Sequence, residues 1–186
     1  MGADGASVLV VDDEEAVADA YALRLSEWYE TEVAYSGSTA LELAEDYDVV
    51  VLDRRMPDMS GDEVLAELRA RDAPCRVIMV TAVDPVTDII DLGFDDYLCK
   101  PVDSETLRAA IDCQLDLAEY DESVRSLLAL VATLDLLEST FSRLELEREE
   151  AYLDARERCD ELRRDLDSEV ADLDDLVAAV EAIDRD

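Results

Sequence analysis

The 186-residue chain is strongly acidic: it carries 16 Lys and Arg against 50 Asp and Glu, which gives a formal net charge of −34. It contains no histidine, so imidazole-based catalysis, zinc sites with imidazole ligands and phosphorylation of a histidine in this chain are excluded. The acidity also disfavours nucleic acid as a partner, because binding to nucleic acid normally begins with a basic surface.

No uncharged run approaches the roughly 20 apolar residues that a membrane-spanning helix needs, and the first residues lack the basic start of a signal peptide. We therefore expect a cytoplasmic protein with no membrane partner. The four cysteines form no CxxC pair, so we expect neither a disulfide nor a zinc site. Fifteen of the sixteen basic residues are arginine, and Lys100 is the only lysine. This acid-rich, lysine-poor composition resembles that of proteins from halophilic archaea.

The first part of the chain predicts alternating strands and helices. Three strands are expected as short, β-branched and almost continuously apolar runs, at Ser7–Val11, Asp48–Leu52 and Arg76–Val80, and two weaker ones at Glu32–Tyr35 and Asp96–Cys99. Helical patterns lie between and after them, at Glu15–Trp28, Ser38–Glu45, Asp62–Arg69, Val86–Leu92 and Ser104–Leu117. Five such units predict an α/β fold with a doubly wound, five-stranded parallel sheet.

The second part, residues 121–186 and below called the tail, predicts helix only, because no glycine or proline occurs after Pro101. Asp121 is the expected N-cap of its first helix. Two apolar stripes follow, from Val124 to Leu144 and from Leu162 to Val180. The second stripe can fold back on the first or pair with another chain, so the tail is partly like a coiled coil and is a candidate homodimer interface.

Polar residues interrupt the apolar runs at one end only. Asp12 and Asp13 end the first strand, Asp53 the third, Thr81 the fourth and Lys100 the fifth. Ligands of an open parallel sheet bind outside the carboxyl ends of its strands. The sequence therefore predicts a crevice with three carboxylates, a hydroxyl and an ammonium group.

Three carboxylates this close need a counter-charge, and an all-oxygen, partly open site suits Mg²⁺. With Mg²⁺ and Lys100 beside it, the Asp53 carboxylate is placed as a nucleophile toward a phosphoryl group. The expected product is an aspartyl phosphate.

The segments VLVVDDEE, VVLDRRMPDMSG, VIMVTA and DDYLCKP, in this order and spacing, resemble the receiver domain of two-component response regulators over about residues 6–118. The resemblance implies that Asp53 accepts a phosphoryl group from a partner histidine kinase. It also implies that Asp12, Asp13, Asp53 and the backbone carbonyl of Arg55 hold Mg²⁺. Lys100 then contacts the phosphoryl oxygens, Thr81 moves to bond them, and Tyr97 follows inward as the switch residue.

The tail resembles the HalX domain that follows receivers in haloarchaeal regulators. We accordingly expect a receiver domain at 1–120 and a helical HalX-like domain at 121–186. By this interpretation the chain is a phosphoacceptor switch and not an enzyme: it promotes only its own phosphorylation and dephosphorylation.

Two other functions stay open. One is a DNA-binding transcription factor with a dimeric tail, for which the only basic cluster is Arg156, Arg158, Arg163 and Arg164. The other is a Mg²⁺-dependent phosphatase with an aspartyl nucleophile. That class usually has a second acid two residues after the nucleophile, where this chain has Arg55.

Overall fold

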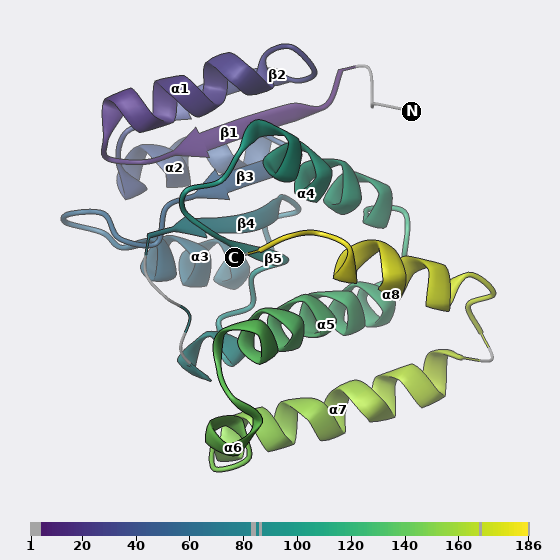
Figure 1. The fold of residues 1–186 in the computed structure, drawn as a ribbon. Helices are drawn as coiled ribbons and strands as arrows, with labels where there is room; N and C mark the ends of the chain where they lie inside the picture. Colours follow the sequence, from purple (N-terminus) through teal and green to yellow (C-terminus); the bar gives the residue numbers. More distant parts are fainter. Residues whose placement is uncertain (1–4, 83–84, 86, 168, 186) are drawn as a thin grey trace.

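The fold is built on one parallel sheet. The computed structural model describes residues 5–82, 85, 87–167 and 169–185. The sheet order is β2-β1-β3-β4-β5 (Figure 1), which confirms the predicted doubly wound α/β fold. Its strands are β1 (Ser7–Val11), β2 (Glu30–Ala34), β3 (Val49–Leu52), β4 (Arg76–Thr81) and β5 (Asp96–Cys99). All residues of β3 are buried, as expected for a central strand covered on both faces.

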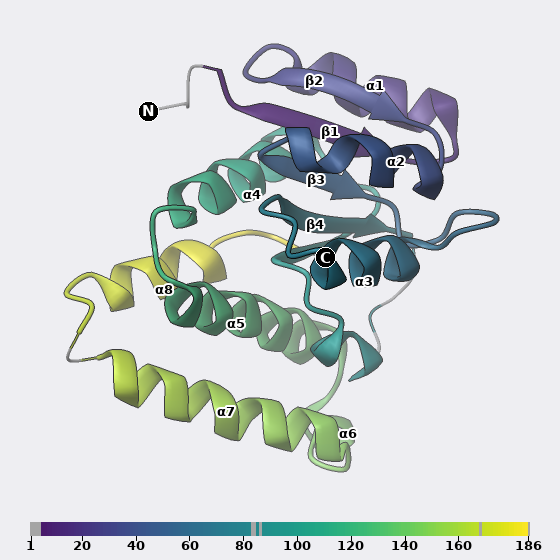
Figure 2. The same ribbon diagram turned by 180° about the vertical axis from the view of Figure 1, so that it is seen from behind.

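Helices cover both faces of the sheet. The helices α1 (Glu15–Leu25) and α4 (Ser104–Leu117) pack on one face, and α2 (Gly37–Leu43) and α3 (Gly61–Ala70) pack on the other, with a short 3-10 turn, η1 (Ala44–Asp46), after α2 (Figures 1 and 2). The loop after β3 leads into α3 through a capping box, in which the Ser60 hydroxyl accepts from the Glu63 N–H and the Glu63 carboxylate accepts from the Ser60 N–H. This cap fixes the start of α3 just after the end of β3.

The helix predicted at Val86–Leu92 is wrong. In the described residues this segment holds only the short 3-10 helix η2 (Thr87–Asp91), and residue 86 lies outside them. Ile89 and Ile90 still point into the core, so the apolar pattern is real. A longer helix is unnecessary there because α5 (Glu122–Thr140), from the tail, contacts both η2 and β5.

The tail is helical throughout most of its length. After α5 it forms α6 (Arg143–Leu146), α7 (Glu150–Leu166) and α8 (Leu173–Glu181). Asp121 is the N-cap of α5 as predicted, because its carboxylate accepts from the N–H groups of Ser123 and Val124. Figures 1 and 2 both show α5 between the sheet and α7. None of the helices in the described ranges is long and apolar enough to cross a membrane.

The apolar residues of α5 serve two partners. Leu130, Leu134 and Leu137 join the core cluster of the sheet, together with residues of η2 and β5. A second cluster joins the start of α5 to the end of α7 and to α8, and it contains Val124, Leu127, Leu128, Val131, Leu166, Leu173, Val177 and Val180. The second stripe thus folds back on the first within one chain. Leu144 was predicted to continue the first stripe and does not: α5 ends at Thr140, and Leu144 is 71% exposed.

Candidate functional site

The carboxyl ends of four strands carry the polar residues that the sequence singles out. Asp12 directly follows β1, Asp53 follows β3, Thr81 ends β4 and Lys100 follows β5. Parallel pairing aligns these ends, with Val11 opposite Leu52 and Thr81 opposite Cys99. Asp12, Asp53 and Thr81 are 3%, 7% and 1% exposed. Such burial of two carboxylates requires a compensating charge.

Lys100 supplies that charge. Its Nζ atom lies 2.6 Å from Asp12 Oδ2 and 2.7 Å from Asp53 Oδ1. Burial alone would lower the pKa of Lys100, but the hydrogen bonds to both carboxylates outweigh it and raise the pKa overall. The side chain is therefore an ammonium group shared by two carboxylates. A compact ammonium with three donors suits this role better than the planar fork of arginine.

The Asp53 carboxylate is held at both oxygens. Oδ1 accepts from Lys100, and Oδ2 accepts from the Arg55 N–H at 2.7 Å. Burial raises the pKa of Asp53, and the hydrogen bond and charge of Lys100 oppose this rise. The protein thus places a partly desolvated carboxylate, with one fixed orientation, at the carboxyl ends of the strands.

Gly61, the first residue of α3, keeps the Asp53 loop in place. Its N–H donates to the Arg54 carbonyl at 2.8 Å. A Cβ atom at residue 61 would collide with the Asp53 carbonyl oxygen and would lie 2.8 Å from Arg54 Cα. Because both are backbone atoms next to the candidate nucleophile, the loop itself would have to move.

We therefore expect Gly61→Ala to lower the free energy of unfolding by about 1–3 kcal/mol, as overpacking does, and to slow phosphorylation of Asp53. Urea unfolding and labelling by acetyl phosphate measure the two effects. Gly37→Ala is the matched control: the atoms nearest to its Cβ would belong to the side chains of Val64 and Met59, at 2.8 and 2.9 Å, and not to the backbone of Asp53 and Arg54. Equal labelling rates for the two variants would contradict the prediction.

The donor set for a cation is only partly assembled. Asp12 and Asp53 lie on either side of the Lys100 ammonium, Asp13 is half-buried beside Asp12, and Arg55 is exposed. Among the described residues no group of three or more His, Cys, Asp or Glu is arranged to hold a metal. The carboxylate oxygens suit Mg²⁺ by their chemistry, and a cation entering here would share them with the ammonium.

The predicted switch residue lies under the tail. Tyr97 is 1% exposed, and its ring lies 5.5 Å from that of Phe94, centroid to centroid. Burial raises its pKa, while a hydrogen bond with Arg54 lowers it. Arg54 is a residue that the sequence interpretation missed: it pairs with Asp62 at 3.0 Å and with Asp88 at 3.4 Å. The sequence signal that could have identified Arg54 is its position directly after the candidate acceptor Asp53.

Comparison with known proteins agrees with this geometry. The family model of the response regulator receiver domain matches residues 8–112, which is more than half of the chain. The chain belongs to the response regulator receiver family. Members of this family are generally signalling switches. Residues 116–183 match the HalX domain, as the sequence predicted.

The similar proteins carry regulatory names. A putative transcriptional regulator of Haloferax volcanii is 43% identical over 84% of this chain and 27% of its own length. The transcriptional regulatory protein CutR of Streptomyces coelicolor is 46% identical over 50% of this chain and 46% of its own length. A solved CheY-like receiver domain from Methanospirillum hungatei is 30% identical, covers 61% of this chain and 96% of that one, and has a TM-score of 0.58. The chain spans about half, or less, of the length of these two curated relatives.

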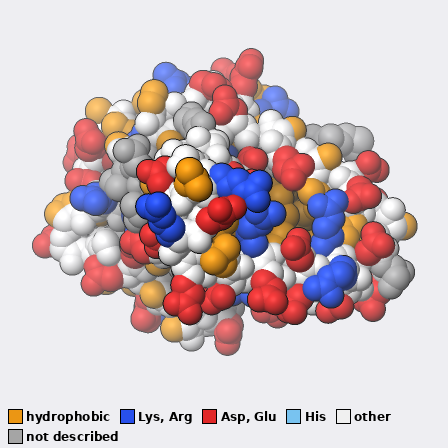
Figure 3. All heavy atoms as spheres, turned by 60° about the horizontal axis from the view of Figure 1, so that its bottom comes forward, with side chains coloured by type: hydrophobic (Ala, Val, Ile, Leu, Met, Phe, Trp, Pro, Cys, Tyr) orange, Lys and Arg blue, Asp and Glu red, His pale blue; other side chains and the backbone are white. Residues whose placement is uncertain are grey.

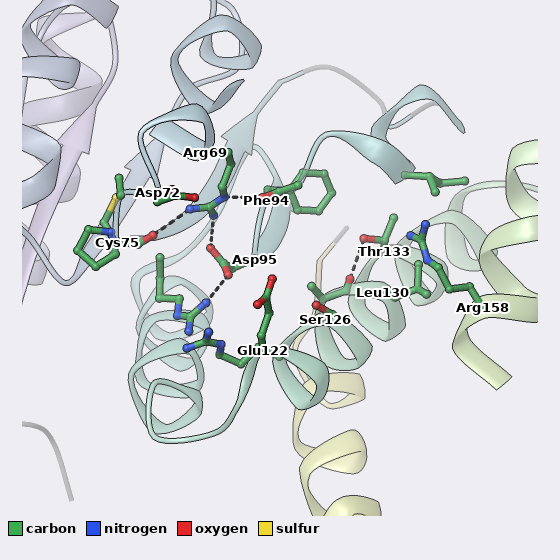
Figure 4. Close-up of a pocket in the computed structure, with 17 residues that line it drawn as sticks. Arg69, Asp72, Cys75, Phe94, Asp95, Glu122, Ser126, Leu130, Thr133 and Arg158 are labelled. Atoms are coloured by element: carbon green, nitrogen blue, oxygen red, sulfur yellow. Dashed lines mark hydrogen bonds and ion pairs between the residues drawn. The ribbon is translucent and has the colours of Figure 1, made fainter. Parts of the chain in front are cut away.

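A separate cavity of about 600 Å³ lies between the receiver and the tail. It is lined from α3, the start of β4 and α5, and so lies by the amino ends of β4 and β5 (Figure 4). Arg69 and Arg76 line it, but both bind the Asp95 carboxylate, at 2.6 and 2.8 Å. Two of its arginines thus share one receiver aspartate. The cavity does not include the strand-end residues of the receiver site.

The basic cluster of the tail lies on the surface of α7. Arg156, Arg158, Arg163 and Arg164 are all exposed, and three of them have partners within the chain. Arg163 pairs with Asp174 at 2.7 Å, and Arg158 with Asp91 of the receiver at 3.8 Å. On the face seen in Figure 3, basic side chains stand among acidic ones. Such mixing weakens the attraction of this face for a phosphate backbone.

Proposed function

We propose that this receiver is the phosphoacceptor of a two-component system. In the proposed reaction a histidine kinase phosphorylates Asp53, and the tail carries the signal onward. The observation that supports this best is the shared ammonium: Lys100 bridges Asp12 and Asp53 within 2.7 Å at the carboxyl end of the sheet. Residues 1–120 would form the receiver domain and residues 121–186 the HalX-like output domain.

In the proposed reaction, an Asp53 carboxylate oxygen forms a bond to phosphorus while the bond from phosphorus to the kinase imidazole breaks, and the bonding electron pair leaves with the imidazole. Lys100 turns toward the phosphoryl oxygens and neutralises part of their charge. The Thr81 hydroxyl, at the end of β4, donates to one of them. Water attack on the same phosphorus later regenerates Asp53, so the chain promotes only its own phosphorylation and dephosphorylation.

We propose Mg²⁺ as the cofactor, held by Asp12, Asp13, Asp53 and the backbone carbonyl of Arg55. When bound, it would supply positive charge to the phosphoryl oxygens. The family match supports this proposal, and so does the all-oxygen donor chemistry at the strand ends.

We infer that the output concerns transcription, since the Haloferax and Streptomyces relatives are named as transcriptional regulators. The tail would act mainly through protein contacts, because the arginines of α7 are largely paired within the chain. A homodimer through the tail would use surfaces other than the packed parts of the two stripes, such as those around Leu144 of α6 and Leu153 of α7, which are 71% and 47% exposed. Direct DNA binding, also suggested by the names of the relatives, would have to overcome the net charge of −34.

Replacement of the acceptor tests the proposal. Incubation of the full chain with acetyl phosphate and Mg²⁺ in concentrated KCl should add the mass of one phosphoryl group, and Asp53→Asn should abolish this addition because an amide oxygen is a poor nucleophile. Intact-protein mass spectrometry measures it.

Asp58→Asn is the matched control for the same change of side chain. Asp58 is exposed, lies five residues further on, and has a φ of 65°, a conformation that asparagine tolerates. It should be labelled like the wild type. Labelling of Asp53→Asn at the wild-type level would show that the acceptor is another residue.

A further inference from the structure

The end of the tail encloses the outer strand of the receiver sheet. Among the described strands, β5 stands at the edge of the sheet and pairs with β4. On its other edge the Cys99 N–H donates to the Arg185 carbonyl at 2.9 Å. Ile183 packs with the core cluster on the face of α1 and α4, whereas Leu134 and Leu137 of α5 pack on the opposite face. The tail therefore contacts β5 on both faces and along its open edge, as the course of the chain in Figure 1 also shows.

A buried ion pair fixes this arrangement. Arg185 Nε lies 2.7 Å from Asp96 Oδ1, and Arg185 Nη2 lies 3.2 Å from Asp96 Oδ2. The two side chains are 2% and 1% exposed. Arg185 Nη1 also donates to the carbonyls of Val180 and Ile183, at 2.7 and 3.1 Å. A two-point guanidinium–carboxylate pair is geometrically selective, and loss of Arg185 would leave the Asp96 carboxylate buried without its counter-charge. Arg185 Nη1 also lies 3.7 Å from Asp135 Oδ2 of α5, which ties the same side chain to that helix.

The same short strand carries the switch machinery. Asp96 directly precedes Tyr97, and its Oδ1 accepts from the Tyr97 N–H at 2.8 Å. Cys99, which bonds to Arg185, directly precedes Lys100, whose ammonium contacts Asp53. Tyr97 itself lies in one apolar cluster with Leu130, Leu134 and Leu137 of α5. β5 thus contacts the tail at both of its ends, and its carboxyl end leads directly to Lys100 of the candidate phosphorylation site.

We propose that the Asp96–Arg185 pair docks the tail on β5, and that docking of the tail and occupancy of Asp53 by a phosphoryl group favour each other. The second part rests on the proposed function, in which the Tyr97 ring moves inward as Thr81 moves to the phosphoryl oxygens. In this structure the docked tail covers that ring, which is 1% exposed and packs in one cluster with Leu134 and Leu137 of α5. Because linkage is reciprocal, a tail that stabilises the inward ring strengthens binding at Asp53, and binding at Asp53 strengthens docking by the same factor.

The test measures hydrogen exchange of the full chain in concentrated KCl, with and without Mg²⁺ and beryllofluoride, which mimics a phosphoryl group on a carboxylate. In the wild type, beryllofluoride should slow exchange both in the Asp53 loop and in α5. Arg185→Gln should speed exchange in α5 about tenfold or more. It should also raise the beryllofluoride concentration needed for half-protection of the Asp53 loop by roughly fivefold or more, the lower range of measured allosteric couplings.

Arg163→Gln is the matched control, because Arg163 also lies in the tail and also pairs with an aspartate, but at the surface. It should leave both measurements unchanged. If Arg185→Gln fails to fold, Arg185→Lys replaces it: this variant keeps the charge and loses the two-point geometry, so α5 should exchange at a rate between those expected for the wild type and Arg185→Gln.

If α5 exchanges hydrogen in the Arg185 variants at the same rate as in the wild type, the Asp96–Arg185 pair does not dock the tail. If beryllofluoride protects the Asp53 loop but exchange in α5 becomes faster or does not change, the coupling is overturned and the proposed function stays intact. If beryllofluoride protects nothing and acetyl phosphate labels nothing, the proposed function fails and the coupling fails with it. The exchange rates without beryllofluoride then still decide whether Arg185 docks the tail.

Discussion

Transfer from concentrated to dilute salt is expected to destabilise the protein severely. With 50 acidic against 16 basic residues, the folded chain concentrates a net charge of −34 in a small volume. At about 0.1 M KCl the Debye length is roughly 10 Å, so carboxylates repel one another across the distance between neighbouring surface side chains. Above about 1 M KCl the Debye length falls to about 3 Å or less, and this repulsion is screened. A repulsion of about 5 kcal/mol would lower the melting temperature of a chain this size by roughly 10–20 °C.

Circular dichroism melts in KCl from about 0.1 to about 3 M measure this shift across the range in which screening changes most. Potassium acetate at equal ionic strength is the control, since screening of carboxylates depends on the cation and both salts should restore stability alike. A melting temperature that is unchanged across the KCl series would contradict the prediction.

Leu137→Ala is expected to weaken the receiver and the tail together. The Leu137 side chain is fully buried and belongs to the cluster that joins α5 to Phe94 and Tyr97. Truncation of a buried leucine typically costs about 2–5 kcal/mol, because a cavity remains. The cavity would open between the receiver and the tail. We therefore expect one unfolding transition whose midpoint lies at a lower urea concentration than in the wild type, measured by urea titration.

The control for this substitution is Leu144→Ala, at a leucine that is 71% exposed. Surface changes of this kind usually alter stability by less than about 0.5 kcal/mol. If Leu137→Ala instead gave two transitions of which only one moved, the receiver and the tail would be independent units, and the shared cluster would contribute nothing to their coupling.

The sequence predicted the parts of the fold that local patterns determine. The strand at Asp96–Cys99 and the helix at Ser104–Leu117 begin and end where expected, and β1 does too. A run of β-branched residues defines β1, and polar residues at the carboxyl ends of the strands mark where they stop. For this reason the sequence alone predicts Asp12, Asp53, Thr81 and Lys100 together at one edge of the sheet.

The remaining features depend on contacts between distant residues. The pattern around Ile89 and Ile90 indicated burial correctly, but not that α5, more than thirty residues later, would take the space of a full helix beside β5. Arg185 gave no local signal either, because its partner Asp96 is 89 residues away and acids are common everywhere in this chain. Only the folded arrangement distinguishes this arginine from the exposed ones.

The position of α5 also bears on how such regulators recombine during evolution and in the laboratory. The family matches end at residue 112 and resume at residue 116, which invites exchange of output modules at that junction. In this chain, however, Ile89, Phe94 and Tyr97 are covered by the module beyond the junction. A graft made there would uncover an apolar patch beside β5. A working chimera must therefore bring an equivalent helix or carry polar replacements on that face.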